Sequence, residues 1–479
     1  MSSKRSFFNL FLVLFLNSIM LPLFSQVRFE KSYPFMNETI GYGITQTFDD
    51  GYVICGTFRA GEILKGLVIR TDAVGDTLWT RLYENALYAF CPVPEGGFLF
   101  TGWHNSSHEQ NLLMMKTDKY GNIEWENSVG TSSSRGRSIC RTADSGYCIV
   151  GGTTPYAMAA ERMLVVRINK NGNLMWTKLF GDGVLSMNGQ SIIPDNNAGF
   201  VICGTKSSEM ETGSDMVLLN IDSAGNAIWM KTYYKSLHSD QGYGVVNTLS
   251  GGYFAAGIAR LPDNANQALY LVRTNDQGDT IWTKTFDTLA WASPGVHAIP
   301  CNSGGFAITG VVYDPVSSNN NVLLKRFDAE GNILWGQIFG SLGHEYAFNL
   351  NTTSDQGFIV SGSVWDPVFQ TTDAYLAKTD DQGHVTPVST DHKELPRNIC
   401  IFPDPTPGLF TLTSVDPVIE ITVISFKGVT VREITSQPTA IHTVTTDLSS
   451  LPNGIYMVKI RTTEGFFLRK VIKDRPVHQ

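Results

Sequence analysis

The chain has 479 residues, with 36 Lys and Arg against 44 Asp and Glu, which gives a formal net charge of −8. This acidic balance argues against a nucleic acid or an anionic membrane as a partner held by bulk charge, because such binding needs a surplus of basic side chains. With 42% hydrophobic and 17% charged residues the chain can form a folded core, and its 45 Gly, 17 Tyr and 27 Phe favour short strands joined by tight turns.

Residues 1–26 have the order of segments that is typical of a secretory signal peptide. Lys4 and Arg5 precede an apolar run from Phe7 to Phe24, and Ser25 and Gln26 follow it. The alternative is an uncleaved membrane anchor, although the run is at the short end of the roughly 20 residues that a span needs. No other segment approaches that length, so we expect a mature chain that begins near Val27 and has no transmembrane segment.

Seven cysteines occur at positions without the close spacing of a zinc knuckle or a redox motif. An odd number cannot pair completely, so a disulfide framework is not expected. Cys55 and Cys203 each stand directly before a Gly at the same position of an internal repeat, where other copies carry Thr or Ser. We therefore interpret these two cysteines as small residues of the core.

The internal repeat recurs every 46 to 54 residues between Val27 and Gly383, a period that is typical of propellers and solenoids. Its first half is a polar residue, any residue, Gly, then Tyr or Phe, with another Gly four residues later. The aromatic residue of the seven copies is Tyr52, Phe98, Tyr147, Phe200, Tyr253, Phe306 and Phe358. Alternating apolar residues on both sides predict a strand, a tight turn and a strand, with the first Gly supplying a positive φ.

The second half is Asp or Asn, two residues, Gly, three residues, then Trp. It predicts another hairpin, in which the Asp or Asn binds backbone amides of the turn and the Gly takes the left-handed conformation. Each turn offers too few carboxylates for calcium. The Trp would start the next strand and wedge between neighbouring sheets, which gives a structural role to Trp79, Trp125, Trp176, Trp229, Trp282 and Trp335.

The last repeat is incomplete, because Asp380 and Gly383 are followed by Pro387 where Trp should stand. The missing fourth strand is supplied by the N-terminus: Phe29 takes the position of the Trp, and Lys31 and Tyr33 continue the pattern. The sequence therefore predicts an all-β fold over residues 27–385, a seven-bladed β-propeller closed by the N-terminal strand. Such closure hides the sheet edges that an open solenoid would leave.

The Asp-x-x-Gly-x-x-x-Trp turn resembles the Trp-docking motif of quinoprotein propellers. It is less similar to the Asp-box of sialidases, which has one fewer residue between Gly and the aromatic residue. In those families the motif lies between the third and fourth strands of each blade and is structural. The resemblance implies the fold and transfers no catalytic residue.

A polar linker at residues 386–398 precedes a different all-β unit, residues 399–479. Its marks are Phe402-Pro403-Asp404 with Pro407-Gly408, then Lys427-Gly428, then Leu451-Pro452-Asn453-Gly454-Ile455-Tyr456 and a basic finish. This unit resembles the type A C-terminal sorting domain of the type IX secretion system of Bacteroidetes, with Asp404 in place of the usual Asn. The resemblance implies a small β-sandwich, a partner in that secretion machinery, and delivery through the periplasm to the cell surface or medium. An ordinary terminal sandwich is the alternative.

Both repeated turns fall on one face of the predicted propeller, so the irregular loops fall on the opposite face, where binding groups concentrate. Three Trp outside the repeat belong there, with His and carboxylates beside them. Aromatic rings beside polar groups suit sugars, although each Trp could instead only pack its own loop. The candidate ligand-binding residues are Trp103, His104, His108, Trp291, His344, Glu345, Trp365 and Asp366.

No nucleophile elbow, zinc-protease motif or phosphate loop occurs in the sequence. We expect no catalytic residue, no metal and no cofactor, and we interpret the chain as an exported, non-catalytic protein that binds an extracellular glycan, polymer or protein. The alternative is a secreted carbohydrate-active hydrolase or lyase that uses acids of the variable face, such as Glu109 and Glu345. A structural part of a surface assembly without a small ligand stays open.

Overall fold

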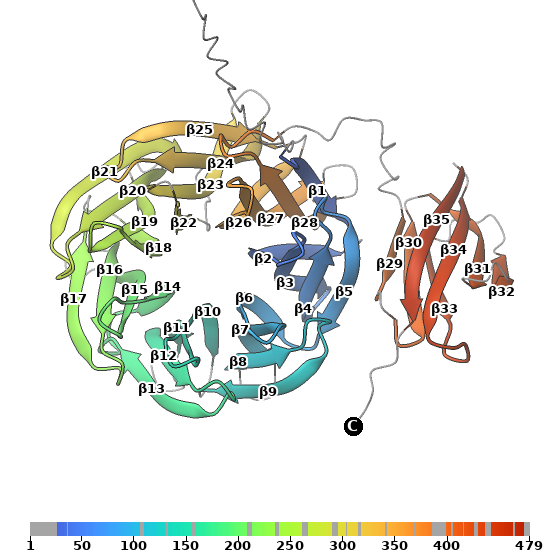
Figure 1. Ribbon diagram of the computed structural model, residues 1–479, viewed down its shortest axis with the longest axis horizontal. Helices are drawn as coiled ribbons and strands as arrows, with labels where there is room; N and C mark the ends of the chain where they lie inside the picture. Colours follow the sequence, from blue (N-terminus) through green and yellow to red (C-terminus); the bar gives the residue numbers. More distant parts are fainter. Residues whose placement is uncertain are drawn as a thin grey trace, which may run out of the picture.

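Seven four-stranded antiparallel sheets, here called blades 1 to 7, follow one another around a ring in the computed structural model (Figure 1). The structure describes residues 26–35, 37–105, 110–130, 133–154, 160–207, 213–234, 239–260, 267–289, 296–302, 304–314, 318–340, 343–366, 370–385, 399–403, 406–414, 416–425, 430–435, 442–462 and 465–473. Within these residues every regular element is a strand, which confirms the prediction of an all-β chain.

The first three blades take their strands in chain order. Blade 1 contains β2 (Glu38–Gln46), β3 (Tyr52–Ala60), β4 (Ile63–Thr71) and β5 (Thr77–Tyr83). Blade 2 contains β6 (Ala86–Pro92), β7 (Phe98–Asn105), β8 (Gln110–Thr117) and β9 (Ile123–Val129). Blade 3 contains β10 (Ser134–Arg141), β11 (Tyr147–Thr153), β12 (Arg162–Ile168) and β13 (Leu174–Phe180).

The next three blades repeat this arrangement. Blade 4 contains β14 (Met187–Pro194), β15 (Phe200–Ser207), β16 (Ser214–Ile221) and β17 (Ala227–Tyr233). Blade 5 contains β18 (Asp240–Asn247), β19 (Tyr253–Arg260), β20 (Gln267–Thr274) and β21 (Thr280–Leu289). Blade 6 contains β22 (His297–Pro300), β23 (Phe306–Asp314), β24 (Asn319–Phe327) and β25 (Ile333–Phe339). The first strand of each blade lies nearest the centre of the ring (Figure 1).

Blade 7 is assembled from both ends of the ring. It contains β26 (His344–Thr352), β27 (Phe358–Asp366), β28 (Thr371–Thr379) and, as its outer strand, β1 (Phe29–Tyr33). β1 pairs antiparallel with β28, from Phe29 opposite Lys378 to Tyr33 opposite Ala374. β26, β27 and β28 also pack against β2 of blade 1. The predicted pairing of residues 27–33 with the strand near Tyr375 is confirmed for Phe29–Tyr33.

The repeat tryptophans pack where neighbouring blades meet. A Cβ added to the turn Gly of the following blade would lie 2.3–3.0 Å from the indole of Trp79, Trp125, Trp176, Trp229, Trp282 or Trp335. Only Gly lets the ring lie this close to the backbone. Phe29 lies on Gly75 of blade 1 in the same way, at 2.7 Å. Where the residue four positions later is Tyr, its hydroxyl donates to the carbonyl of that Gly, as Tyr33 does to Gly75 at 2.8 Å and Tyr83 to Gly121 at 2.7 Å.

The turns before the fourth strands have the predicted chemistry. The Asp72 carboxylate accepts from the amides of Val74 and Asp76 at 3.0 and 2.8 Å, and Gly75 has a φ of 81°. The same bonds are made by Asp118, Asn169, Asp222, Asn275 and Asp380. These turns, together with the turns between first and second strands, define what we call the turn face. The opposite face is the variable face.

The prediction for the first repeated Gly is wrong in part. In four copies the positive φ belongs to the residue before it, namely Asp50, Ser145, Ala198 and Gln356. Gly is needed there for close approach, because a Cβ on Gly51 would lie 2.2 Å from the Thr71 carbonyl oxygen. In the copies with two consecutive Gly, such as Gly96 and Gly97, both have a positive φ.

In several blades a buried basic side chain at the end of the third strand bonds the turn face. Lys378, 1% exposed, donates to both carboxylate oxygens of Asp355, at 3.0 and 2.9 Å, and to the Thr379 carbonyl at 2.7 Å. Arg70 and Arg167 make the same contacts with Asp49 and Asp144 in blades 1 and 3. Each ion pair ties the first turn of its blade to the third strand.

Replacing Lys378 by Met should destabilise the protein by about 2 kcal/mol, because the Asp355 carboxylate loses its partner while staying partly buried. Burial opposes it, but hydrogen bonds from Thr353 and Lys378 and the charge of Lys378 hold the pKa of Asp355 below its usual range. Because the folded pKa lies below the unfolded value of about 3.9, this stabilisation is complete above that pH and is lost as the pH falls through the folded pKa.

Denaturant titrations between pH 2 and pH 7 measure this effect. Lys378→Met should lose part of the acid-dependent stability of the wild type. Lys378→Arg is the matched control and should keep it, because blades 1 and 3 carry Arg70 and Arg167 at this position. An unchanged pH profile for Lys378→Met would contradict the assignment.

The C-terminal strands form two small sheets that share one core. One contains β29 (Ile399–Phe402), β30 (Leu409–Ser414) and β33 (Thr443–Asp447). The other contains β31 (Val418–Ser425), β32 (Thr430–Thr435), β34 (Gly454–Thr462) and β35 (Gly465–Lys473). Phe402 packs against Phe35 and Phe58 with ring centroids 6.3 Å apart in both pairs, so this unit contacts the ring beside the closing strand.

Candidate functional site

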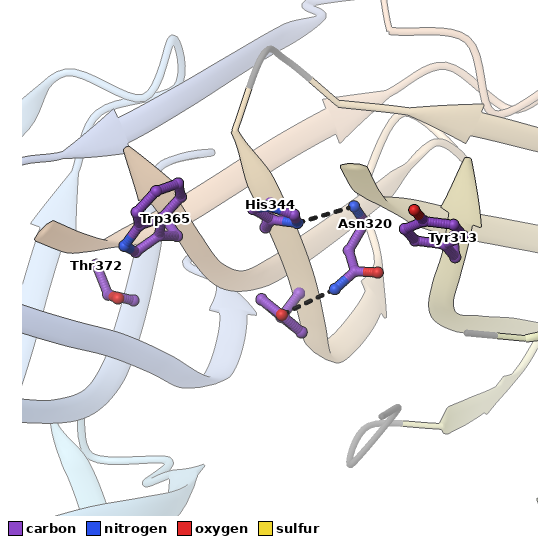
Figure 2. Close-up of a pocket in the computed structure, with 6 residues that line it drawn as sticks. Tyr313, Asn320, His344, Trp365 and Thr372 are labelled. Carbon is purple, nitrogen blue, oxygen red and sulfur yellow. Dashed lines mark hydrogen bonds between the residues drawn. The ribbon is translucent and has the colours of Figure 1, made fainter. Parts of the chain in front are cut away.

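A hollow of about 420 Å³ lies on the variable face between blades 6 and 7. Strand direction explains why its wall comes from five strands: β23 and β27 run toward this face, whereas β24, β26 and β28 start there. The lining residues are Tyr313 of β23, Asn320 of β24, His344 and Tyr346 of β26, Trp365 of β27 and Thr372 of β28 (Figure 2).

Three of these residues form a row across blade 7. His344 lies directly opposite Trp365, and Trp365 lies opposite Thr372 in the sheet register. The rings of His344 and Trp365 are 5.6 Å apart between centroids and tilted by 53°. Figure 2 shows the indole and the imidazole side by side, with Tyr313 on the far side of Asn320.

Asn320 connects the two blades. Its backbone amide donates to Nδ1 of His344 at 3.3 Å, and its side-chain amide donates to the Tyr346 hydroxyl at 2.8 Å. Because Nδ1 accepts, the neutral imidazole carries its proton on Nε2, which can donate to a ligand. The Asn320 carbonyl oxygen and the hydroxyls of Tyr313 and Thr372 add further polar groups to the wall.

Two aromatic rings of the hollow are accessible to solvent. The exposed fraction is 37% for Trp365 and 48% for Tyr313. A flat, partly exposed ring can stack on an apolar face of a ligand while neighbouring amides and hydroxyls bind its polar edge. The hollow therefore combines two solvent-exposed aromatic rings with hydrogen-bond donors and acceptors.

Glu345 does not line this hollow, although it lies between His344 and Tyr346. Successive side chains of a strand point to opposite faces, and Glu345 is completely buried. Its carboxylate lies beside the connection between blades 6 and 7, because a Cβ on Gly340 or Gly343 would be 2.6 or 3.5 Å from its oxygens. Asp366 is the last residue of β27, with its backbone paired to Thr371.

Trp103 and His104 lie in blade 2, separated from the hollow by blade 1. Trp103 is opposite Ala86 and Leu112, and its buried Nε1 has no hydrogen-bond partner in the described part of the chain. His104 Nε2 is 3.7 Å from a carboxylate oxygen of Glu126. The structure thus brings His344 and Trp365 together and leaves the blade 2 pair apart. His108 and Trp291 lie outside the described residues.

Four lining residues were missed from the sequence: Tyr313, Asn320, Tyr346 and Thr372. A signal for Tyr313 does exist, because Tyr313-Asp314-Pro315-Val316 and Trp365-Asp366-Pro367-Val368 repeat the same aromatic-Asp-Pro-Val phrase in consecutive blades. The other three residues have no distinctive local pattern. Tyr346 and Thr372 lie in the same sheet as Trp365, and Asn320 reaches the site through the packing of blade 6 against blade 7.

Two further properties concern metals and membranes. Among the residues with described coordinates, no group of three or more His, Cys, Asp or Glu could hold a metal ion. In the same part of the chain, no helix is long and apolar enough to cross a membrane.

Comparison with known families identifies one region of the chain. Residues 400–474 match the family described as the secretion system C-terminal sorting domain. The curated protein sequences contain no significant match. The solved structures supply likenesses to the ring at low sequence identity.

One likeness is the alpha-L-arabinanase of Penicillium chrysogenum complexed with arabinobiose, with a TM-score of 0.41 and 10% identity over 61% of this chain and 92% of that one. Another is the subtype N10 neuraminidase-like protein of A/little yellow-shouldered bat/Guatemala/060/2010, with a TM-score of 0.39 and 8% identity over 74% and 97%. A third likeness is Sqt1 of Chaetomium thermophilum bound to the N-terminus of the ribosomal protein L10, with a TM-score of 0.42 and 8% identity over 74% of this chain and 98% of that one. At these values no activity is assigned to this chain.

The sorting-domain match carries a firm conclusion about destination. It covers β29 to β35 nearly completely, and it agrees in place with the unit recognised from the sequence at residues 399–479. A sorting domain of the type IX secretion system indicates export to the cell surface or the medium. The C-terminal region of this chain is therefore a sorting domain of that secretion system.

Proposed function

We propose that this chain is an exported, non-catalytic protein that binds an extracellular glycan, polymer or protein on the variable face of its ring. In this proposal residues 1–26 are a cleaved signal peptide, residues 27–385 are a seven-bladed β-propeller of the Trp-docking type, residues 386–398 are a linker, and residues 399–479 engage the type IX secretion machinery. The route runs through the periplasm.

The hollow between blades 6 and 7 carries the binding part of the proposal. Trp365 and Tyr313 offer open aromatic faces, and Asn320, His344 and Tyr346 offer donors and acceptors beside them. The apolar faces of a sugar ring stack on such side chains while its hydroxyls bind the polar groups. The volume of about 420 Å³ is within the usual range for small-molecule pockets, and it suits a short segment of a glycan.

A secreted hydrolase or lyase is the alternative. Glycoside cleavage uses two carboxyl groups on either side of the scissile bond, and among the described residues lining the hollow none is Asp or Glu. Glu345, which lies next to His344 in β26, is buried behind that wall. The binding function therefore has the stronger support, and incubation of the purified chain with each glycan that it binds tests for cleavage products.

Glycan-array binding of the full chain, followed by calorimetry on each hit, tests the proposal. Trp365→Ala should weaken binding about tenfold or more, because the indole supplies the main stacking surface. Tyr313→Ala should act in the same direction with a smaller loss.

Tyr234→Ala is the matched control, because Tyr234 is 73% exposed and lies after β17, far around the ring from the hollow. It should bind like the wild type. If Trp365→Ala binds every hit as tightly as the wild type, the hollow is not the binding site.

A further inference from the structure

The centre of the ring is lined by residues that β-bulges project from the inner strands. In six inner strands the register shifts by one residue, and the extra residues are Tyr42, Tyr88, Arg137, Gln190, Tyr243 and Phe348. Such a bulge redirects a side chain and is common at functional positions. Because these strands surround the axis of the ring (Figure 1), the bulges bring side chains of different blades together.

Contacts between side chains of different blades support this placement. Tyr42 of blade 1 packs on Tyr88 of blade 2 and on Phe348 of blade 7, with ring centroids 5.3 and 5.2 Å apart. Burial raises the pKa of Tyr88 in blade 2 and of Tyr243 in blade 5, and the charge of Arg137 in blade 3 opposes both shifts. Blade 4 separates blades 3 and 5, so the charge of Arg137 acts beyond the neighbouring blade.

Two arginines of β10 share one carboxylate at this centre. Nη2 of Arg137 donates to Oε1 of Glu161 at 3.2 Å, and Nη2 of Arg135 lies 3.6 Å from the same oxygen. The side-chain amide of Asn188 donates to the other oxygen of Glu161 at 3.1 Å. Two guanidinium groups against one carboxylate leave a local excess of one positive charge. Nη1 of Arg137 is buried and has no hydrogen-bond partner among the described residues.

The charged cluster is reachable from the variable face. The Arg135 side chain is 51% exposed. Arg135 precedes the bulge of β10 and is the second residue of that strand, which starts on the variable face. Arg59, 46% exposed, pairs with Glu38 at 3.3 Å at the same end of blade 1. Burial raises the pKa of Tyr88 while the charges of Arg135, Arg59 and Arg137 oppose that shift. Because its pKa is raised, the Tyr88 hydroxyl keeps its proton at neutral pH.

We propose that Arg135, Arg137 and Tyr88 form a second binding site, at the axis of the ring, for the carboxylate of a uronic acid residue in an acidic glycan. A guanidinium binds a planar carboxylate through two parallel hydrogen bonds, and the half-exposed guanidinium of Arg135 can present such a pair of donors to a ligand beside the charge of Arg137. The rings of Tyr88 and Tyr42 offer faces to the sugar. This site goes beyond the proposed function, because it lies in blades 2 and 3 and would bind its ligand independently of the hollow between blades 6 and 7.

Calorimetry with the full chain tests the site, using tetragalacturonate and its fully methyl-esterified form as probes, with tetraglucuronate and tetramannuronate and their esters as further pairs. The ester keeps the chain length and removes the charge. At least one acid should bind about tenfold or more tightly than its ester, because the charge-assisted bonds are lost in the ester. The affinity should fall as salt rises from 50 to 500 mM.

Arg135→Gln should remove most of this preference for the acid. The variant should still fold, because the Arg135 side chain is half-exposed. Arg137→Lys keeps the charge near Glu161 while removing the planar fork, and it should also weaken the acid. Arg141→Gln is the matched control on the same strand, because Arg141 lies at the turn-face end and its side chain bonds only Ser145 within the described residues. It should bind like the wild type.

Trp365→Ala separates this site from the hollow, because it should leave the preference for the acid unchanged. Acids and esters that bind equally, acids that do not bind at all, or equal losses in Arg135→Gln and Arg141→Gln would overturn the proposal. Tighter binding of an acidic peptide than of every uronate would overturn it as well.

Discussion

Phe29→Ala should destabilise the ring by about 3–5 kcal/mol, the usual cost of truncating a buried Phe. Phe29 is 1% exposed, its ring packs edge-on against Tyr52 at 5.8 Å, and it covers Gly75 of blade 1. The truncation leaves a cavity at the junction where a strand from one end of the ring completes a sheet from the other. We expect the midpoint of denaturant unfolding to fall, measured by circular dichroism on the full chain.

Two substitutions make this result specific. Phe48→Ala removes the same atoms from a side chain that is 93% exposed, and it should leave stability within about 0.5 kcal/mol of the wild type. Phe29→Trp restores the residue that six other blades carry at this position, so it should fold and keep most of the stability. If Phe29→Ala unfolds at the same denaturant concentration as Phe48→Ala, the closing strand does not hold the ring together.

The ring was predictable because its repeat records local backbone constraints. Gly75 has a φ of 81° and lies under an aromatic ring, so any side chain there would be both strained and in collision. The same requirement recurs in every blade and leaves the same residue types at the same spacing. Phe29 could be assigned to the last blade because Lys31 and Tyr33 keep the spacing of that pattern.

The candidate site was predictable only for residues whose identity is unusual. Trp365 and His344 stand out because Trp is rare outside the repeat, whereas Asn320 and Thr372 look like ordinary strand residues. Trp103 was grouped with Trp365 although blade 1 separates them, because a repeat sequence does not state how far apart two blades lie. Glu345 was included because the sequence does not show which residues of β26 face the hollow and which face the interior. Side chains alternate along a strand, so the neighbour of His344 points the other way.

The bulges were not predicted at all, since a single extra residue in a strand has no fixed sequence signal. Their position becomes clear from the second repeated Gly, which faces them. A Cβ on Gly56, Gly151 or Gly204 would lie 1.8–1.9 Å from a carbonyl oxygen of the inner strand just before its bulge. The second Gly is therefore required by close approach of the bulged strand.

Gly204→Ala should consequently destabilise the protein by about 4 kcal/mol or more, beyond the usual range for a single substitution. The new Cβ would meet the Asn188 carbonyl oxygen at 1.9 Å and the Cα of Gly189 at 3.1 Å, both backbone atoms that cannot rotate away. Relief requires β14 to move from β15, which breaks the ladder on both sides of Gln190. Thermal unfolding followed by circular dichroism measures the loss.

Gly61→Ala is the matched control, because its Cβ meets nothing within 4 Å although its φ of 60° is unfavourable for Ala. It should cost only about 1–2 kcal/mol, the price of the left-handed conformation alone. The difference between the two variants isolates steric contact from backbone conformation, because Gly204 has no positive φ. Equal losses in both would show that the inner strand β14 can yield, in which case close approach to Gly204 does not fix the bulge at Gln190.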